Sequence, residues 1–331
     1  MKISRIVVAV VFAGFCASGV TPARADLIQS QVQTHLTILA TFDSTITSDP
    51  NAAQIESAIN SAISAYQSNF SDPITVNITF QEGRGLGSST FGVYTFSYYS
   101  FYNALLADAT TADDTAALAR LAQDPAPTGI TSVNPVTGTT FVHLKAANAR
   151  AIGLNCGCGN EGGTITLNTN VLAPGSLGSS GAYNLVPVVE HEIDEILGLG
   201  STLGLGLTGA SGTYPYAEDF FRFASAGTRS FSESSSITSY FSIDGATDLA
   251  QFNQNLGGDY GDWASNPLPP GVAAQVQDAF ATPGALPSLG VELRALDVIG
   301  YNRVVTPEPG TMFLMGGGLL LAAFARRRRN G

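Results

Sequence analysis

The sequence predicts an α+β fold, and three observations support this fold class. Residues 55–66 repeat their apolar side chains at helical spacing. Residues 75–80 and 164–168 alternate polar and apolar side chains, which is typical of strands. Residues 185–198 combine apolar and acidic side chains, with a proline in the first turn and glycine at the end, which indicates a helix of about three turns. Helices and strands are therefore expected in one chain.

The first predicted helix is long and amphipathic. Pro50 and Asn51 precede it, and one of its faces carries six apolar residues: Ile55, Ala58, Ile59, Ala62, Ile63 and Tyr66. In the strand that follows, Val76, Ile78 and Phe80 point to one side.

The other elements are shorter. A helix is expected near residues 114–121, and a strand around residues 141–144. The alternating run at 164–168 is expected to be an edge strand. Residues 289–301 predict a last helix, which ends at Gly300 and has a structural role only.

Composition excludes two classes of protein. Hydrophobic residues make up 44% of the chain and charged residues 12%, which is the opposite of the balance in a disordered protein. The formal net charge is -11, although basic residues concentrate at the two ends, in residues 1–25 and 326–329. The region between these ends is strongly acidic and has few bases, so we expect no nucleic-acid partner.

The first 25 residues have the pattern of a secretory signal peptide. Lys2 and Arg5 form the charged region, an apolar run spans residues 6–15, and a small-x-small cleavage site ends at Ala25. The apolar run is shorter than the ~20 residues that a membrane-spanning helix needs. We therefore predict export through the Sec translocon and cleavage by signal peptidase after Ala25.

Two cysteines remain after this cleavage, because Cys16 belongs to the signal peptide. Cys156 and Cys158 are separated by a single glycine. In an oxidising compartment we expect a disulfide between them that closes a local loop. The alternative is a metal site, but no second cysteine pair or nearby histidine completes a zinc set.

The C-terminus carries three signals in order. Residues 307–309 are Pro-Glu-Pro, residues 312–325 are apolar and of marginal length for a bilayer, and residues 326–329 are arginines. Residues 306–331 thereby resemble the PEP-CTERM sorting signal of Gram-negative bacteria. The resemblance implies transient insertion of the apolar stretch into the inner membrane, processing by an exosortase, and delivery to the cell surface or extracellular matrix. An ordinary tail anchor is the alternative.

The predicted helix at 185–198 carries residues suited to metal chemistry. His191 and Glu195 are four residues apart, so their side chains lie on one helix face. In H-E-x-x-H enzymes two histidines at this spacing hold Zn²⁺, and the glutamate after the first is the general base. Glu192 occupies the base position here, and a carboxylate replaces the second histidine. The alternative is a helix whose acidic first turns only complement its dipole.

This helix and the region after it resemble a PEP-CTERM-associated family of zinc metalloproteases with His-Glu-Ile-x-Glu on the helix. The resemblance spans residues 140–302 and includes DFFRFASAGTRSF (219–231), YFSIDGATDLAQFNQ (240–254), GDYGDWAS (258–265) and ALDVIGY (295–301). It implies a metzincin-like zincin domain with a mixed sheet, an upper lobe over residues 26–203 and a loop-rich lower lobe over residues 204–305. It also implies that His191 and Glu195 bind zinc and that Glu192 is the base.

The third metal ligand has no spacing argument. A three-histidine site would need His35 and His143, and the mature domain lacks the methionine of a metzincin turn, since all three methionines lie at the ends. We therefore expect an acidic ligand; Asp219 is the first choice, with three residues in reserve: Glu218, Asp244 and Asp259. Such an oxygen-rich site also suits Mn²⁺ or Ca²⁺, and a structural Ca²⁺ in the acidic region 244–262 is a further alternative.

These features predict an exported, surface-sorted zinc endopeptidase that hydrolyses extracellular polypeptides. Glu192 would activate a metal-bound water, and the edge strand at 164–168 would align the substrate by strand addition. Tyr214 or Tyr216 would either stabilise the oxyanion or simply pack in the core. The alternative is a non-enzymatic surface or matrix protein that kept the fold and lost the metal, which the 36 glycines and abundant Ser and Thr fit equally well.

Overall fold

The computed structural model describes residues 35–122, 127–173, 182–207, 209–210 and 212–304. The chain divides into two units, residues 1–32 and 33–331, and the following description concerns the second. The predicted signal peptide (1–25) and the predicted sorting segment (306–331), with its apolar stretch, lie outside the described residues. Within the described part, no helix has the length and apolar character needed to cross a membrane.

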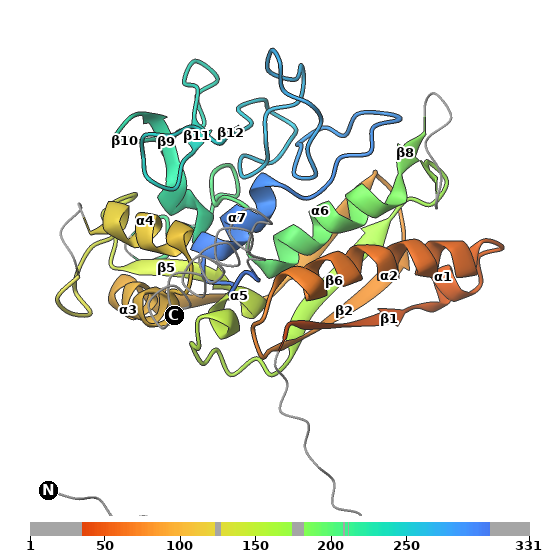
Figure 1. Cartoon of the computed structure of the whole chain (residues 1–331), viewed down its shortest axis with the longest axis horizontal. Coiled ribbons are helices and arrows are strands. Elements are labelled where there is room, and N and C mark those ends of the chain that lie inside the picture. Colours follow the sequence, from red (N-terminus) through yellow and green to blue (C-terminus); the bar gives the residue numbers. More distant parts are fainter. Residues whose placement is uncertain (1–34, 123–126, 174–181, 208, 211, 305–331) are drawn as a thin grey trace, which may run out of the picture. The chain divides into compact units, whose positions relative to one another are not determined.

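The main sheet has four strands in the order β1-β2-β6-β3 (Figure 1). Strands β1 (Thr37–Phe42), β2 (Thr75–Glu82) and β6 (Glu161–Leu167) are parallel, and β3 (Gly87–Phe91) is antiparallel to β6. The alternating side chains of β2 that were predicted to share one side are all buried: Val76, Ile78 and Phe80.

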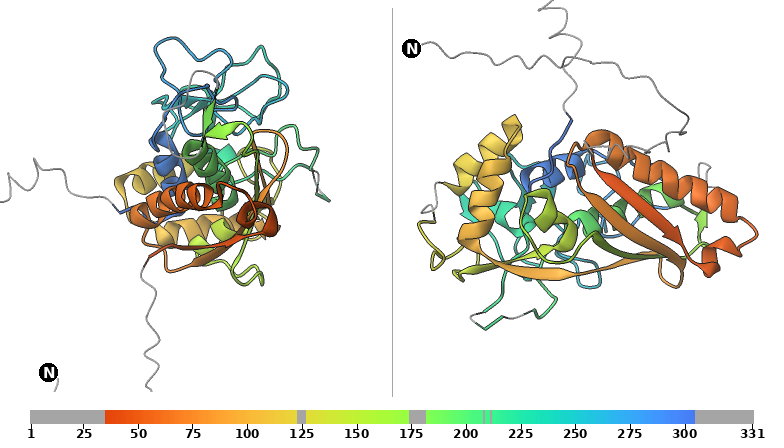
Figure 2. Two further views of the ribbon diagram at one scale, coloured as in Figure 1. Left: turned by 90° about the vertical axis from the view of Figure 1, so that its right-hand side faces the viewer. Right: turned by 90° about the horizontal axis from the view of Figure 1, so that it is seen from below.

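Two long helices lie side by side next to this sheet. α2 (Ala52–Asn69) contacts β1 and α6, and α6 (Leu185–Leu197) contacts β6 and β3 (Figure 1, Figure 2). The predicted apolar face of α2 is buried in full: Ile55, Ala58, Ile59, Ala62, Ile63 and Tyr66. Burial of an isoleucine side chain stabilises a fold by about 1.5–3 kcal/mol. The Tyr66 hydroxyl also donates a hydrogen bond of 2.7 Å to the Glu190 backbone oxygen, which joins the two helices.

Shorter elements complete the unit. β4 (Val93–Ser97) pairs with β5 (Phe141–Lys145), and both strands contact α3 (Tyr98–Asp108) and α5 (Ala146–Ala151). A second sheet has the order β10-β9-β11-β12, with strands Thr228–Arg229, Arg222–Ser225, Tyr240–Phe241 and Ala250–Gln251. The remaining elements are α1 (Ser44–Thr47), α4 (Ala112–Leu121), β7 (Leu172–Ala173), β8 (Tyr183–Asn184), the 3₁₀ turn Glu218–Phe221 and α7 (Val291–Val298).

The predicted short elements near 114–121, 141–144 and 289–301 form as α4, β5 and α7. Gly300, just after α7, has a φ of +110°, a conformation that favours glycine. These positions could be located because each depends on spacing within a few neighbouring residues.

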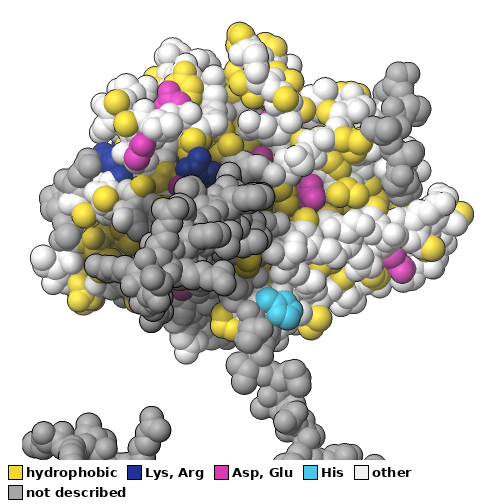
Figure 3. Space-filling view, viewed as in Figure 1, with side chains coloured by type: hydrophobic (Ala, Val, Ile, Leu, Met, Phe, Trp, Pro, Cys, Tyr) yellow, Lys and Arg dark blue, Asp and Glu magenta, His cyan; other side chains and the backbone are white. Residues whose placement is uncertain are grey.

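One hydrophobic core joins the helices, the main sheet and the segments after residue 204. Phe220 stacks on Tyr98 and Phe101, and Trp263 packs against aromatic rings of the second sheet and its neighbouring loop. This core contains residues from both sides of the predicted lobe boundary between residues 203 and 204. On the face shown in Figure 3, charged side chains of the described residues are few and scattered among apolar and uncharged ones.

The expectation that residues 164–168 form an edge strand is wrong. β6 pairs with β2 on one side and with β3 on the other, so it is an interior strand. The strand at the end of the order, next to α6, is β3. Its sequence, Gly-Ser-Ser-Thr-Phe, contains mostly small polar residues, so its pattern gives little strand signal.

The loop between α5 and β6 contains the predicted disulfide. Cys156 and Cys158 are bonded to each other, and the Gly157 N–H donates to the Asn155 side chain in the same loop. Neither cysteine lines the cleft described below. The pair is therefore a local closure of the loop.

Candidate metal centre

The sequence explains where helix α6 begins and where it ends. Pro187 lies in the first turn, where its missing N–H removes no helical hydrogen bond. Gly198 ends the helix with a φ of +147°, and its N–H donates to the backbone oxygens of Asp194 and Glu195. A Cβ at residue 198 would also lie 2.8 Å from the Ile299 Cδ1 atom. Both its backbone conformation and its packing therefore require glycine.

The two faces of α6 have different environments. Ile193 and Ile196 are fully buried in the core, whereas His191, Glu192 and Glu195 line a cleft of about 600 Å³. The helical period places His191 and Glu195 one turn apart on the cleft side. The cleft lies between this face, the beginning of β3, and the loops of residues 203–205, 256–262 and 274–287.

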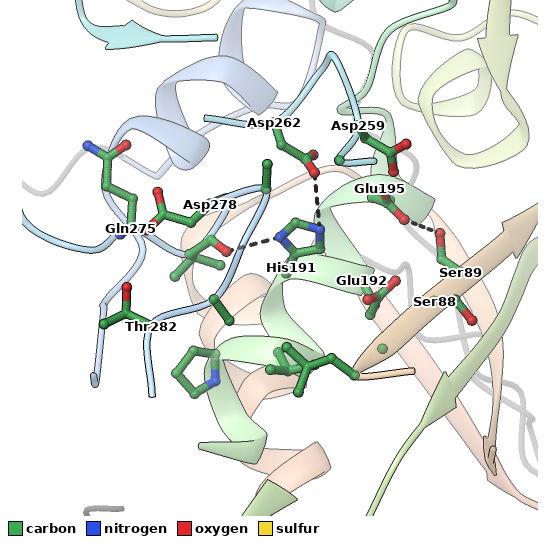
Figure 4. Close-up of a pocket in the computed structure, with 18 of the residues that line it drawn as sticks. Ser88, Ser89, His191, Glu192, Glu195, Asp259, Asp262, Gln275, Asp278 and Thr282 are labelled. Atoms are coloured by element: carbon green, nitrogen blue, oxygen red, sulfur yellow. Dashed lines mark hydrogen bonds and ion pairs between the residues drawn. The ribbon is translucent and has the colours of Figure 1, made fainter. Parts of the chain in front are cut away.

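His191, Glu195 and Asp262 converge in the cleft (Figure 4). One potential ligand atom from each residue lies within 4.8 Å of those of the other two. The His191 Nε2 and Asp262 Oδ2 atoms are 3.8 Å apart. Zinc binds imidazole nitrogen and carboxylate oxygen at about 2.0–2.2 Å, so its tetrahedral ligand atoms are about 3.4 Å from one another. The three side chains therefore fit a divalent cation after a small contraction.

Each of these three side chains is held by a second group. The His191 ring uses Nδ1 for a 3.1 Å hydrogen bond to the Val276 backbone oxygen, which leaves Nε2 facing Asp262. The Ser89 hydroxyl of β3 donates to Glu195 Oε2. The Gln277 amide donates to Asp262 Oδ1 at 2.9 Å. Such outer partners fix the orientation and protonation of metal ligands.

Close backbone packing brings Asp262 to the helix. A Cβ at Gly261 would collide with the Cα of Gly200, just beyond the end of α6, so glycine permits the contact. On the other side of Asp262, the Trp263 backbone N–H donates to the Gln277 backbone oxygen at 2.8 Å. The Trp263 indole also donates to Glu292 of α7 at 3.0 Å. Asp262 is therefore anchored through both of its chain neighbours.

Glu192 lies beside the three converging residues. It is only 5% exposed, and its Oε2 atom has no hydrogen-bond partner among the described residues. Gly87 of β3 packs so closely that a Cβ there would collide with Glu192 Oε1 and lie 2.9 Å from Val188 Cγ1. The edge strand thus fixes the position of this carboxyl group while one of its oxygens stays available.

The acidic environment shifts the protonation of this site. Burial alone lowers the pKa of His191, but the carboxylates of Asp262, Glu192 and Glu195 together raise it to about 10. Burial raises the pKa of Glu192 to about 8 and that of Asp262 to about 7, against the opposing effect of the His191 charge. Without a cation, His191 therefore carries a proton that balances the carboxylates. A divalent cation would replace this proton and lower the carboxyl pKa values.

A buried lysine lies behind the cleft. The Lys145 ammonium donates to the Leu199 backbone oxygen and lies 3.8 Å from the centre of the Phe91 ring. Burial lowers its pKa, and the charges of Glu195 and Glu218 oppose this effect. Its positive charge partly compensates the acidic side chains of the site.

Asp219, the first choice for the third ligand, does not join this group. Its carboxylate accepts hydrogen bonds from the Ser201 hydroxyl and from the backbone N–H groups of Thr202 and Tyr216. It does not line the cleft. Asp219 thus stabilises the loop that leaves α6, and Asp262 is the acidic residue that lies with His191 and Glu195.

The three acidic residues held in reserve as third ligands lie in different places. Glu218 accepts a hydrogen bond from the Gly200 N–H. Asp244 accepts from the backbone N–H groups of Ala246 and Thr247 within its own turn. Asp259 lines the cleft near Glu195, and burial raises its pKa.

The other residues named from the sequence lie outside the cleft. His35 precedes β1 and is exposed. His143 lies on β5, where its ring packs against Tyr214. Tyr214 and Tyr216 are buried and do not line the cleft, so the structure places them as packing residues.

Sequence reasoning missed most of the surrounding shell. Asp262 had a partial signal, because it lies in the acidic region 244–262, for which the sequence suggests a structural Ca²⁺. Ser89, Val276 and Gln277 had no signal, since a serine, a backbone oxygen and a glutamine in loops or weak strands have many other roles. Only their spatial neighbours identify them.

Comparison with known proteins identifies one segment. Residues 305–329 match the model of the PEP-CTERM protein-sorting motif. The protein is exported and sorted to the cell surface. This motif implies a Gram-negative bacterial host and exosortase-type processing and secretion machinery as partners. No curated protein and no solved structure matches the chain, so the α+β region that carries the cleft is described by its own geometry.

Proposed function

We propose that this PEP-CTERM protein is a metal-dependent peptidase that acts on polypeptides outside the cell. The observation that carries the proposal is the convergence of His191, Glu195 and Asp262, within 4.8 Å of one another, beside a buried carboxyl group with a free oxygen. Three protein ligands and one open position are the arrangement of catalytic zinc sites.

The donor set supports zinc as the first choice of metal. The imidazole of His191 suits zinc better than it suits calcium, and two carboxylates complete the set. The two carboxylate charges would offset the +2 charge of the ion, so water at the open position would be less acidified than in a three-histidine site. When bound, the metal would supply a Lewis acid that polarises the substrate carbonyl and acidifies water.

The roles of the chain's own residues follow from their positions. Glu192, whose buried Oε2 atom has no hydrogen-bond partner among the described residues, would take a proton from the attacking water and return it to the leaving amine. The edge of β3 that pairs with no other strand of the described residues borders the cleft and would offer backbone groups to an extended polypeptide. The position of the His-Glu-x-x-Glu helix beside the antiparallel strand β3 supports the proposed peptidase.

Metal content is the first test. Elemental analysis of the purified, zinc-loaded chain should give about one zinc per molecule. We expect His191→Ala, Glu195→Ala and Asp262→Asn each to lower this content strongly, whereas Asp248→Asn, which changes an exposed aspartate outside the cleft, leaves it unchanged. Loss of zinc in Asp248→Asn as well would show that binding is not specific to the three converging residues.

Hydrolysis is the second test. The zinc-loaded chain should cleave an unstructured protein such as casein, and Glu192→Gln should keep its zinc and lose activity by at least about a hundredfold. A wild-type chain that takes up no transition metal would sink the peptidase proposal. That result would favour the alternative of a non-enzymatic surface or matrix protein.

A further inference from the structure

One end of the cleft has an apolar wall. It lies between the first turns of α6 and the loop of residues 274–287. Pro187 and Val188 line it from the helix, and Val276, Ala279 and Ala281 line it from the loop. An apolar wall of this kind favours the hydrocarbon part of a substrate side chain.

The carboxyl group of Asp278 lies among these apolar residues. Asp278 is 6% exposed and lines the cleft. Its Oδ2 atom accepts a 3.0 Å hydrogen bond from the Gln275 N–H, whereas Oδ1 has no partner among the described residues. Asp278, Gln275 and Thr282 lie on the side of His191 that is opposite to Glu195 and Ser89 (Figure 4). A buried carboxylate oxygen without a partner is costly unless a ligand or proton satisfies it.

The position of Asp278 is fixed before any ligand arrives. Its backbone pairs with that of Trp263 in an isolated bridge, and the Ala279 N–H donates to the Trp263 oxygen at 3.0 Å. Burial raises the pKa of Asp278 to about 7, so a nearby cation would favour its charged form. A rigidly held group loses little freedom on binding.

Apart from His191, the charged side chains that line the cleft are acidic. Glu233 and Asp259 line it in addition to Asp278 and the residues of the metal centre, and no lysine or arginine among the described residues lines it. The Glu233 side chain accepts a 3.0 Å hydrogen bond from the Gly204 N–H, and both residues line the cleft. A basic peptide would therefore be attracted along the whole cleft.

We propose that this end of the cleft binds a basic side chain of the polypeptide substrate, and that Asp278 is the residue that recognises its charge. Lysine and arginine combine a hydrocarbon stem with a charged head. The stem would lie against Val276, Ala279 and Ala281, and the head would donate to Asp278 Oδ1. This inference rests on the proposed function, because it names the substrate class of the same site.

Peptide binding to an inactive chain tests the proposal directly. The probe is a series of blocked, dye-labelled hexa-alanine peptides with one lysine placed at each position in turn, and a matched series with norleucine. Their binding to zinc-loaded Glu192→Gln is measured by fluorescence anisotropy. At one position we expect lysine to bind at least about tenfold more tightly than norleucine, because a hydrogen bond to a charged partner forms only with lysine.

The Asp278→Asn variant in the same background should remove this preference, whereas Asp248→Asn should retain it. Equal binding of the two series at every position, no measurable binding, or a lysine preference that persists in Asp278→Asn would overturn the subsite. The comparison of lysine with norleucine is made on a chain with Asp278 in place, so it remains decisive if Asp278→Asn does not fold.

The same peptides separate this proposal from the peptidase proposal. Lysine-selective binding without any cleavage by the zinc-loaded wild-type chain would contradict the peptidase activity and leave the subsite standing. Cleavage that does not depend on lysine would support the peptidase and overturn the subsite.

Discussion

Single residues decide whether the cleft can hold a metal ion. The pair His191 and Glu195 needs only a helix, but the third group, the Asp262 carboxylate, depends on Gln277, whose amide donates to Oδ1 while Oδ2 faces His191. Gln277 is fully buried, so its hydrogen bond is shielded from water. Outer partners of this kind typically change metal affinity by about 10–100-fold.

The Gln277→Leu variant should therefore bind zinc about 10–100-fold more weakly than the wild type, because Asp262 loses the group that orients it. Competition with a zinc-binding dye measures the affinity. Gln54→Leu on the exposed side of α2 is the control and should have no effect. Unchanged zinc affinity in Gln277→Leu would contradict the orienting role of the amide.

At the scale of elements, the site is a junction between helix α6 and edge strand β3. Ser89 of β3 holds Glu195, and Gly87 of β3 leaves room for Glu192. Two residues of one strand thus contact both the proposed metal ligand Glu195 and the proposed base Glu192. Successive strand residues point to opposite faces, so residues 87 and 89 reach the same helix.

Gly87→Ala should separate these two roles. The new methyl group would collide with the flexible end of Glu192, and we expect this to displace the carboxyl group and lower hydrolysis by at least about tenfold. Zinc content should stay near that of the wild type, because the new methyl group does not collide with His191, Glu195 or Asp262. Gly129→Ala is the matched control, since a methyl group there meets open space. Equal loss of hydrolysis in both variants would refute the role of Gly87.

At the scale of the whole molecule, many carboxyl groups are buried in an acidic chain. Asp72 accepts hydrogen bonds from the Asn302 N–H, and Asp297 accepts one from the Thr111 hydroxyl. Burial raises the pKa of each from 3.8 to about 7. The folded chain therefore binds more protons than the unfolded chain between these pH values, so its stability falls as pH rises through them.

We predict that the metal-free chain is most stable near pH 5 and that its melting temperature drops by at least about 5 °C by pH 8. Protonated His191 acts in the same direction, because stability from a raised imidazole pKa is lost as pH rises. Thermal unfolding in chelator, followed by circular dichroism, measures this. Asp72→Asn should reduce the drop and Asp248→Asn should not; a melting temperature that rises from pH 5 to pH 8 would contradict the prediction.

Elements that depend on residues close together in the sequence could be predicted, and pairings between distant segments could not. The buried face of α2, the alternation of β2 and the limits of α6 depend on neighbours within a few residues, and each was located correctly. The edge of the sheet was misplaced, because the pairing of β6 with β3 depends on segments far apart in the chain.

The sequence by itself determined the sorting motif, the helix that carries His191 and Glu195, and the proximity of Glu192 to both, since these depend on local order and helical period. Only the tertiary structure decided that Asp262 completes the group, that Asp219 serves a loop, and that Asp278 faces the cleft. Loops bring these carboxylates to α6 along paths set by backbone packing, such as that of Gly261 on Gly200. A periodic sequence pattern cannot predict the course of such a loop, because the course depends on contacts between residues that are far apart in the chain.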